Sequence, residues 1–301
     1  EQATLKDRVF FEKLKGICHL HELLYFPNTI TSILKNHHPS VVRINGYNIS
    51  NHIEKSQKIL HIVTERPVNG SLHSYFNFIS EYNSKNSSQS KIKIKSNASK
   101  IIKFSNEQKY MIVLGTVSGI EFIHKHGFVH SKLDPTTIFL NEQLQPIICD
   151  YEFKHASKEI DAKIDIFKFG ILVYYILTET SIFDTFNDPN KIAQYIINKK
   201  LPQFSKLYGK YWTSLITRCL KINPNERPEA KTLALELFDK DKMDTYIKSI
   251  SPDYEYEFTD AQLAYINNLR YHREILYRNS TDDFDIFRFI DRHDIYVEDM
   301  E

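Results

Sequence analysis

The residues best suited to chemistry lie in one short loop, GFVHSKLDPTTIFL, at residues 127–140. His130, Lys132 and Asp134 place an imidazole, an ammonium and a carboxylate close together, and such groups transfer protons in active sites. Lys132 stands where a catalytic loop of this form would be expected to carry an acid. An ammonium stays protonated near neutral pH unless it is strongly desolvated, so Lys132 cannot accept a proton. The loop has therefore either moved its catalytic group or kept its form without its chemistry.

The composition narrows the classes of protein to consider. The chain has 301 residues, of which 42% are hydrophobic, so it can bury a sizeable core. Its formal charge of +1 argues against nucleic acid or an anionic membrane as a partner. The longest apolar run, at residues 169–178, is too short to span a bilayer. Three sparse cysteines without metal-type spacing predict a reducing compartment, and we expect the cytoplasm.

The elements that must position these residues change character along the chain. Short runs rich in aromatic and β-branched residues predict strands at 8–14 and 58–65, with a helix between them at 29–37. From residue 105 the helical period dominates. It predicts helices at 110–127 and 165–179, and a helix pair within 211–237 that breaks at NPNERP.

Two charged segments stand apart from this pattern. Residues 83–103 carry six lysines and no acid, which predicts a basic surface loop or a docking strip for an acidic partner. Residues 282–301 carry eight acids against two arginines, with aromatic and aliphatic residues between them. This acidic-aromatic tail either packs on its own domain or binds a partner. We predict a front unit at 1–66, a helical unit at 67–240 and a C-terminal extension at 241–301.

Six segments, taken in order, resemble a eukaryotic protein kinase. The similarity covers roughly residues 8 to 238 and predicts an α+β, bilobal kinase-like fold, with a truncated β-rich front lobe and a mainly helical back lobe. The segments are HHPSVVRINGY (37–47), LHIVTERPVNGSLHSYF (60–76), SGIEFIHKHGFVHSKLDPTTIFL (118–140), PIICDYEF (146–153), KIDIFKFGILVYYILT (163–178) and RCLKINPNERP (218–228). The resemblance implies structural roles for Asp165 and Arg227.

The catalytic positions depart from the family pattern H-R-D-L-x-x-x-N. The place of the catalytic base holds Lys132, and the place of the metal-binding Asn holds Thr137. Asp134, where the family usually has a lysine, could serve as a displaced base, and a Lys132–Asp134 pair would reverse the usual polarity. His130 is expected to be structural.

The metal-binding segment and the loop that follows it also differ. Asp150 is retained and could hold magnesium weakly, but Tyr151 and Glu152 replace the Phe and Gly of the family's DFG motif. Only 14 residues separate Asp150 from Asp165, which leaves no room for a regulated loop with its A-P-E anchor. Arg227 therefore lacks its usual glutamate, and we expect it to pair with Glu159 or another acid.

The adenine site implied by the resemblance is altered as well. The strand lysine falls at Glu12 or Lys13, and a phenylalanine such as Phe11 stands where the family has a small alanine. At the hinge, Thr64 and Glu65 precede Pro67, and proline has no N–H to donate to adenine. The residues of this degenerate nucleotide site are Phe11, Glu12, Lys13, Thr64, Glu65 and Pro67.

These departures favour a catalytically inactive kinase-like domain that binds, scaffolds or regulates a protein partner in signalling. On this interpretation the chain is not an enzyme. No cofactor is expected beyond weak binding of ATP and magnesium, and the protein partner is unknown. The alternatives are an atypical, weak Ser/Thr/Tyr phosphotransferase that uses Asp150 and Asp134, or a module that senses ATP without turning it over.

Overall fold

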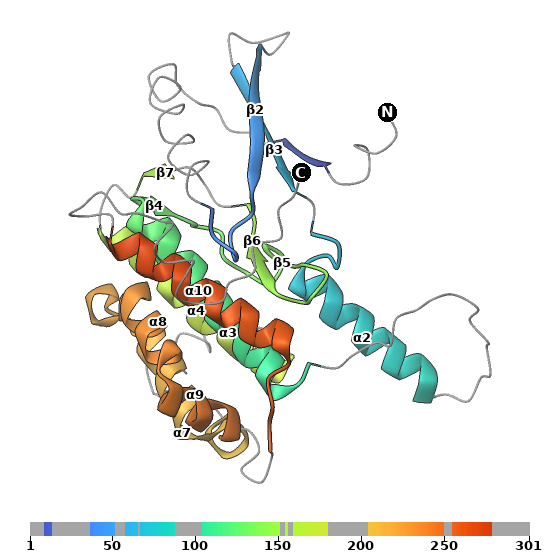
Figure 1. Cartoon of the computed structure of the whole chain (residues 1–301), viewed down its shortest axis with the longest axis vertical. Coiled ribbons are helices and arrows are strands. Elements are labelled where there is room, and N and C mark those ends of the chain that lie inside the picture. Colours follow the sequence, from blue (N-terminus) through green and yellow to red (C-terminus); the bar gives the residue numbers. More distant parts are fainter. Residues whose placement is uncertain are drawn as a thin grey trace.

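The structure is a computed structural model, and it describes residues 9–13, 37–51, 58–65, 67–87, 104–150, 154–155, 159–179, 204–249 and 255–278. A small sheet lies above a group of helices, with two short strand pairs at their junction (Figure 1).

The front sheet has three antiparallel strands in the order β1-β3-β2: β1 (Val9–Lys13), β3 (Lys58–Glu65) and β2 (Ile44–Asn51). The central strand β3 pairs with both neighbours, so that Phe11 lies opposite Val63 and Ile49 opposite Leu60. The strands predicted at 8–14 and 58–65 are confirmed. The helix predicted at 29–37 falls almost wholly outside the described residues.

The long helix α3 (Asn106–Lys125) forms the centre of the back lobe. Ser105 begins it by accepting a hydrogen bond from Gln108 N at 3.2 Å, which satisfies one of the free N–H groups of the first turn. Gly127, with a φ of 80°, turns the chain just beyond its end. Nearly all of its residues are buried, so the predicted helix at 110–127 is confirmed and begins four residues earlier.

Several further helices of the back lobe pack on α3 or on one another. They are α4 (Glu159–Thr178), α7 (Phe204–Cys219), the short 3-10 turn η1 (Pro224–Glu226) and α8 (Ala230–Phe238). The break predicted at NPNERP is confirmed, because η1 separates α7 from α8. Helix α4 begins six residues before its predicted start at residue 165, since the segment Glu159–Ile164 is already helical.

Helix α2 (Leu72–Ser87) corrects the predicted start of the basic loop at residue 83. The helix carries the chain as far as Ser87, so residues 83–87 are helical rather than looped. The part of the basic segment from 88 to 103 lies outside the described residues.

Two short strand pairs position the loop of interest. Strand β4 (Phe128–Val129) pairs with β7 (Lys154–His155), and β5 (Ile138–Leu140) pairs with β6 (Pro146–Ile148). The segment from His130 to Thr137 therefore runs between β4 and β5, with both of its ends held by strand pairing.

The C-terminal extension adds α9 (Lys240–Lys248) and α10 (Asp260–Arg278) to the back lobe. Helix α10 lies along α3 (Figure 1). Gly115 of α3 permits this approach, because a Cβ at that position would overlap the hydroxyl of Tyr265. The Tyr265 hydroxyl also lies 2.6 Å from Ser40 Oγ. The acidic-aromatic tail at 282–301 lies outside the described residues.

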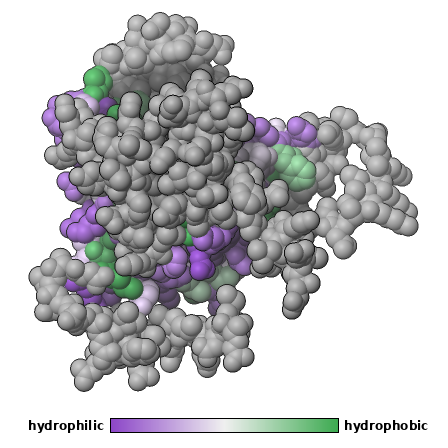
Figure 2. Space-filling model, turned by 90° about the horizontal axis from the view of Figure 1, so that it is seen from above, coloured by the Kyte–Doolittle hydropathy of each residue, from purple (hydrophilic) through white to green (hydrophobic). Residues whose placement is uncertain are grey.

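The described surface is mostly hydrophilic where Figure 2 shows it, with small hydrophobic areas between. Large apolar side chains that are exposed, such as Phe78 of α2, Leu235 of α8 and Leu263 of α10, are distributed over several elements. Among the described residues, no helix is both long enough and apolar enough to cross a bilayer.

Candidate functional site

The buried carboxylate of Asp165, at the start of the apolar part of α4, holds the loop from below. One oxygen accepts hydrogen bonds from His130 N at 2.7 Å and lies 2.9 Å from His124 Nε2. The other accepts from Ser131 N at 2.8 Å. Asp165 is fully buried, so these bonds replace the water that its charge has lost. The structural role expected for Asp165 thus has a specific form, which is to set the loop backbone.

His130 is a structural residue in this arrangement. Its side chain is fully buried, and Nε2 lies 2.9 Å from the carbonyl oxygen of Cys149. Burial lowers its pKa from the ordinary value, so the ring is neutral at pH 7. Its Nδ1 then accepts from Lys132 N at 3.2 Å. His130 joins the loop to the strand that leads to Asp150.

Both ends of this link have a strained backbone. Ser131 has a φ of 65° and Asp150 a φ of 59°, the left-handed region that side chains rarely adopt. Such conformations cost energy and tend to persist at functional sites, where neighbouring contacts enforce them. The ammonium of Lys168, one turn after Asp165 on α4, helps to enforce the first by donating to the Ser131 carbonyl.

Thr137 links the catalytic-loop segment to the segment that leads to Asp150. Its carbonyl accepts from Cys149 N at 2.9 Å, directly before Asp150. Its hydroxyl oxygen accepts from Asp134 N at 3.1 Å. Through these two bonds, Thr137 links the backbone of Asp134 to the residue before Asp150 at the start of β5.

The two carboxylates differ in what they contact. Asp134 is exposed, and Oδ1 accepts from Thr136 N at 2.6 Å and from the Thr136 hydroxyl at 2.5 Å. Its contacts are therefore local, and the sequence-based pair with Lys132 is not formed. Asp150 is half-buried, and within the described part of the chain its carboxylate has no hydrogen bond or ion pair. Burial raises the pKa of Asp150, as expected for a carboxylate that awaits a cation or a donor.

The hinge residues hold the front sheet to the loop region. Thr64 is buried, and Glu65 bonds to Arg43 twice, from its own N–H to the Arg43 carbonyl at 3.1 Å and from Arg43 N to its carboxylate at 3.1 Å. After Pro67, Asn69 N donates to the Leu140 carbonyl at 3.1 Å. The carboxylate of Glu65 is thus engaged with Arg43.

The other predicted nucleotide residues lie on β1. Phe11, Glu12 and Lys13 stand opposite Val63, Ile62 and His61 of β3. Their side chains are outside the described part of the structure. That these three residues, with Thr64, Glu65 and Pro67, form a nucleotide site stays a prediction.

Arg227 corrects an expectation about its partner. Its guanidinium donates to the carbonyls of Lys163 and Lys221, each at 2.8 Å, and lies 4.8 Å above the ring of Phe167. These contacts cap backbone carbonyls, whereas the sequence led us to expect a carboxylate. The described guanidinium thus ties the η1 turn to α4 without an acid.

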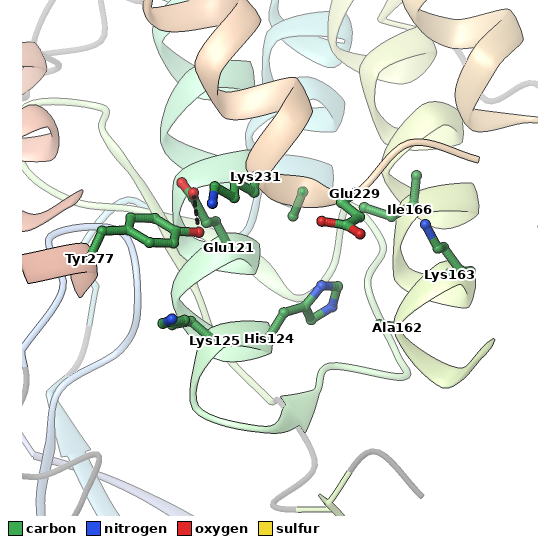
Figure 3. A pocket seen from close by; sticks show the side chains of 10 residues that line it. Glu121, His124, Lys125, Ala162, Lys163, Ile166, Glu229, Lys231 and Tyr277 are labelled. Carbon is green, nitrogen blue, oxygen red and sulfur yellow. Dashed lines mark hydrogen bonds between the residues drawn. The ribbon is translucent and has the colours of Figure 1, made fainter. Parts of the chain in front are cut away.

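Two cavities flank this region. One of about 370 Å³ lies behind the hinge, where His38, Arg43 and Glu65 face His272 of α10. The other, of about 300 Å³, lies between α3, α4, α8 and α10 (Figure 3). His124 lines this second cavity. The sequence analysis missed this residue, because its only signal was its place three residues before Gly127. Within the described ranges, no three metal-ligating side chains gather in one group.

A small antiparallel sheet, a helical lobe around α3, and a strained loop anchored by a buried aspartate define a bilobal, kinase-like α+β protein. A family model described as "Protein tyrosine and serine/threonine kinase" matches residues 153–237, from the end of the Asp150 segment to α8. That match lies wholly in the back lobe and does not include the loop from His130 to Thr137.

Named relatives extend the likeness. The chain is 24% identical to serine/threonine-protein kinase Nek4 of Mus musculus over 139 residues, 46% of this chain and 16% of that protein. It is 27% identical to ribosomal protein S6 kinase alpha-3 of Homo sapiens over 161 residues, 42% of this chain and 22% of that protein. A third relative, dual specificity protein kinase zak2 of Dictyostelium discoideum, is 23% identical over 179 residues, 44% of this chain and 28% of that protein.

These matches, together with the fold, show that the chain is similar to protein kinases, most clearly in its back lobe. The alignments span well under a third of the length of each of these three relatives.

The matches also correct one expectation. The loop substitutions led us to expect a protein that is not an enzyme, whereas the family model and the relatives are named kinases and point to a kinase enzyme. That expectation is therefore wrong.

Proposed function

We propose that the chain is an atypical protein kinase, which transfers a phosphoryl group from magnesium-bound ATP to a protein hydroxyl with an altered catalytic loop. The observation that carries this proposal is the state of Asp150. Its carboxylate is half-buried, its pKa is raised by burial, and its backbone is held in a left-handed conformation. A divalent cation would neutralise this charge and give the carboxylate the partner that the described chain does not provide.

The loop supplies positioning in this proposal. Phosphoryl transfer depends chiefly on placing the reacting groups and stabilising charge, rather than on covalent work by the protein. Asp165 and Lys168 hold the loop backbone, and His130 ties it to Cys149, next to Asp150. Magnesium would supply electrostatic stabilisation of the phosphates when bound.

Asp134 is the carboxylate that would orient the accepting hydroxyl. It is exposed at the loop surface and uses one oxygen for Thr136. Lys132 is also exposed, and its ammonium would face the phosphates as a cation. A loop that orients the acceptor from a displaced position would transfer phosphate slowly, because a small misplacement can cost about a hundredfold in rate.

Two measurements on the full chain test this proposal. A thermal shift with ATP, with and without magnesium, measures binding, since a ligand at 100 times its Kd stabilises the fold by about 2.7 kcal/mol. Incorporation of labelled phosphate into the chain or an added protein substrate measures transfer. We expect a magnesium-dependent shift and slow incorporation, both lost in Asp150→Asn.

The matched variants separate the candidate functions. Asp134→Asn is expected to keep the shift and lose incorporation, whereas Asp260→Asn, an exposed aspartate at the start of α10, should keep both. A shift without incorporation would replace the proposal by ATP sensing. If the wild-type chain at millimolar ATP gives neither a thermal shift nor incorporation, the proposal is overturned. A regulatory or scaffolding role toward a protein partner in the cytoplasm stays a prediction.

A further inference from the structure

The 300 Å³ cavity at one corner of the back lobe has a divided lining. It lies where the last turns of α3 and α10 meet the first turns of α4 and α8 (Figure 3). Ala162, Ile166 and Ala230 form an apolar side. Lysine side chains and the ring of Tyr277 form the other side.

Three cations surround the ring of Tyr277. Lys231 Nζ lies 4.5 Å from its centroid, Lys125 Nζ 5.0 Å and the Arg273 guanidinium 5.1 Å. Of these, Arg273 has a carboxylate, because its Nε lies 3.0 Å from Glu121. In the part of the chain that the structure describes, Lys125 and Lys231 form no ion pair. Like charges held this close repel one another, and an anion between them would relieve that repulsion.

The acids of the cavity offset this positive charge only in part, chiefly through Glu121, which interacts electrostatically with Lys231 as well as with Arg273. Glu121 is buried, and its oxygens are used by Arg273 and by the Tyr277 hydroxyl, which donates at 2.8 Å. Glu229 is exposed at the start of α8, where its side chain makes no capping bond, and Figure 3 shows it on the side of Lys163. The corner of Lys125 and Lys231 therefore stays positive.

The sequence places a matching anion directly after α10. Residues 282–301 carry eight acids against two arginines, with Phe284, Phe287 and Ile290 among them. Asp282 is five positions beyond Tyr277, and five residues span at most about 18 Å. The tail thus begins within reach of the cavity, which raises its effective concentration there far above that of a free partner.

We propose that the acidic-aromatic tail, residues 282–301 of the same chain, docks at this corner. Its carboxylates bind Lys125 and Lys231, and one of its aromatic or aliphatic side chains fills the apolar side next to Ile166. The docked tail would clamp α10 to α4 and α8. It would also contact the wall formed by His124, whose ring lies 2.9 Å from the Asp165 carboxylate that sets the loop. Docking and the state of the loop would then be coupled.

The first experiment is zero-length cross-linking of the full chain with a carbodiimide, which joins carboxylates to amines that they already contact. Mapping by mass spectrometry is expected to find tail peptides linked to Lys125 and Lys231. Lys210 of α7 and Lys240 of α9 are exposed lysines away from the cavity and serve as internal controls. The links should weaken in 1 M salt, where the screening length falls to about 3 Å.

A second measurement does not depend on the cross-link itself. Amine acetylation of the intact chain reports how accessible each lysine is. In a tail variant with Asp291, Asp294, Glu298 and Asp299 changed to their amides, Lys125 and Lys231 should react faster than in the wild type, while Lys240 should not change. The variant touches none of the residues placed in the kinase site.

The outcomes decide between occupants. Links from the tail to the lysines of residues 91–103 in place of the cavity lysines, or links of equal yield to every exposed lysine, would overturn the proposal. A mixture of isotopically light and heavy chains tests the last alternative. If the links join light to heavy chains, the occupant is the tail of a second copy and the intramolecular proposal is wrong. Unchanged acetylation of Lys125 and Lys231 in the tail variant would also contradict it.

Discussion

Asp165 shows how one buried side chain can determine the path of a loop. Its carboxylate satisfies two backbone N–H groups, those of His130 and Ser131, and contacts the ring of His124. Ser131 is held in a strained backbone conformation between these bonds and the bond from Lys168. The stability of the loop therefore depends on a residue that need not touch any substrate.

We expect Asp165→Ala to lower the free energy of unfolding by about 3 to 5 kcal/mol, because removing one partner leaves buried donors without acceptors. Asp165→Asn keeps one acceptor oxygen, so its loss should be smaller. Urea denaturation of both variants measures this. The exposed Asp260→Ala provides the control, and an Asp165→Ala variant as stable as that control would show that the loop is held by other contacts.

Whereas Asp165 stabilises the folded chain, Asp150 destabilises it in the absence of a cation. Its pKa is raised by burial, so the folded state binds the proton more tightly than the unfolded chain does. Stability should therefore fall as the pH rises from the unfolded pKa, near 3.9, through the raised folded pKa, and the cost should be complete above both.

Asp150→Asn is thus expected to raise the melting temperature at pH 7, with a smaller difference near pH 4. Added magnesium and ATP should stabilise the wild type and leave Asp150→Asn unchanged, which would reverse their order. Differential scanning calorimetry at the two pH values checks both statements. If Asp150→Asn is destabilising at pH 7, the carboxylate has a stabilising partner and the cation argument fails.

Helix α10 is the element that most changes the molecule beyond the family resemblance. It lies along α3 and reaches the segment before β2 through Tyr265 and Ser40, whose hydroxyls are 2.6 Å apart. Both hydroxyls are buried, and burial raises the pKa of Tyr265, so the phenol stays protonated. This contact joins α10 to the segment that leads into the front sheet.

We expect Tyr265→Phe to cost about 1 to 3 kcal/mol of unfolding free energy, because Ser40 is left buried without its partner. Gly115→Ala should cost at least as much, because a Cβ at that position would overlap both the Tyr265 hydroxyl and Pro146 Cγ. Since both substitutions act on the Tyr265 hydroxyl, the double variant should lose less than their sum in urea denaturation. Tyr211→Phe, on the surface of α7, is the matched control and should be near neutral. Full additivity would indicate that the two positions act on different contacts.

The elements were predictable where their signals are local. The strand at 58–65 and the helix at 110–127 carry their own periodicity and end signals, which is why sequence reasoning found them. The start of α4 at Glu159 was not found, because its first turns are charged and resemble a loop. Helix α10 was not predicted, because the sequence analysis assigned residues 241–301 only as a C-terminal extension.

In the candidate site, too, some features could be predicted from the sequence and others could not. Asp150, Asp134 and Thr137 could be named from the order of motifs, and strand pairing then links their segments. The partners of Asp165 and Arg227 could not be predicted, because they are backbone N–H groups and carbonyls, which have no sequence signature. Substitutions in the loop predicted an inactive protein, yet residue types alone do not report how the remaining groups are positioned.

Viewed as a whole, the molecule joins its two lobes through a cluster of histidines beside the hinge. His38 is buried, lies 5.9 Å from His272 of α10 by ring centroids and packs on Phe122 of α3. Its Nδ1 accepts a hydrogen bond from Ser40 N at 3.1 Å, which requires that nitrogen to be unprotonated. The loop before the front sheet, α3 and α10 thus meet around a neutral ring.

The pKa of His38 lies well below 6.5, chiefly because of burial and also because of His272 and His126 nearby. The pKa of His272 is lowered by burial as well. In the unfolded chain both rings take up a proton near pH 6.5, whereas in the folded chain they resist it. The unfolded state therefore binds more protons below pH 6.5, and the folded state should lose stability as the pH falls from 6.5 toward the lowered folded values.

His38→Asn tests this mechanism, because an asparagine oxygen can accept the bond from Ser40 N and does not titrate. We expect the wild type to lose more unfolding free energy between pH 7.5 and pH 5.5 than His38→Asn does, as measured by urea denaturation at both values. The same substitution at His73, an exposed histidine on α2, should leave the wild-type slope unchanged. If His38→Asn keeps the full slope, the acid sensitivity comes from other groups. A flattened slope would instead show that protonation at this junction weakens the contact that holds α10 to the front of the molecule.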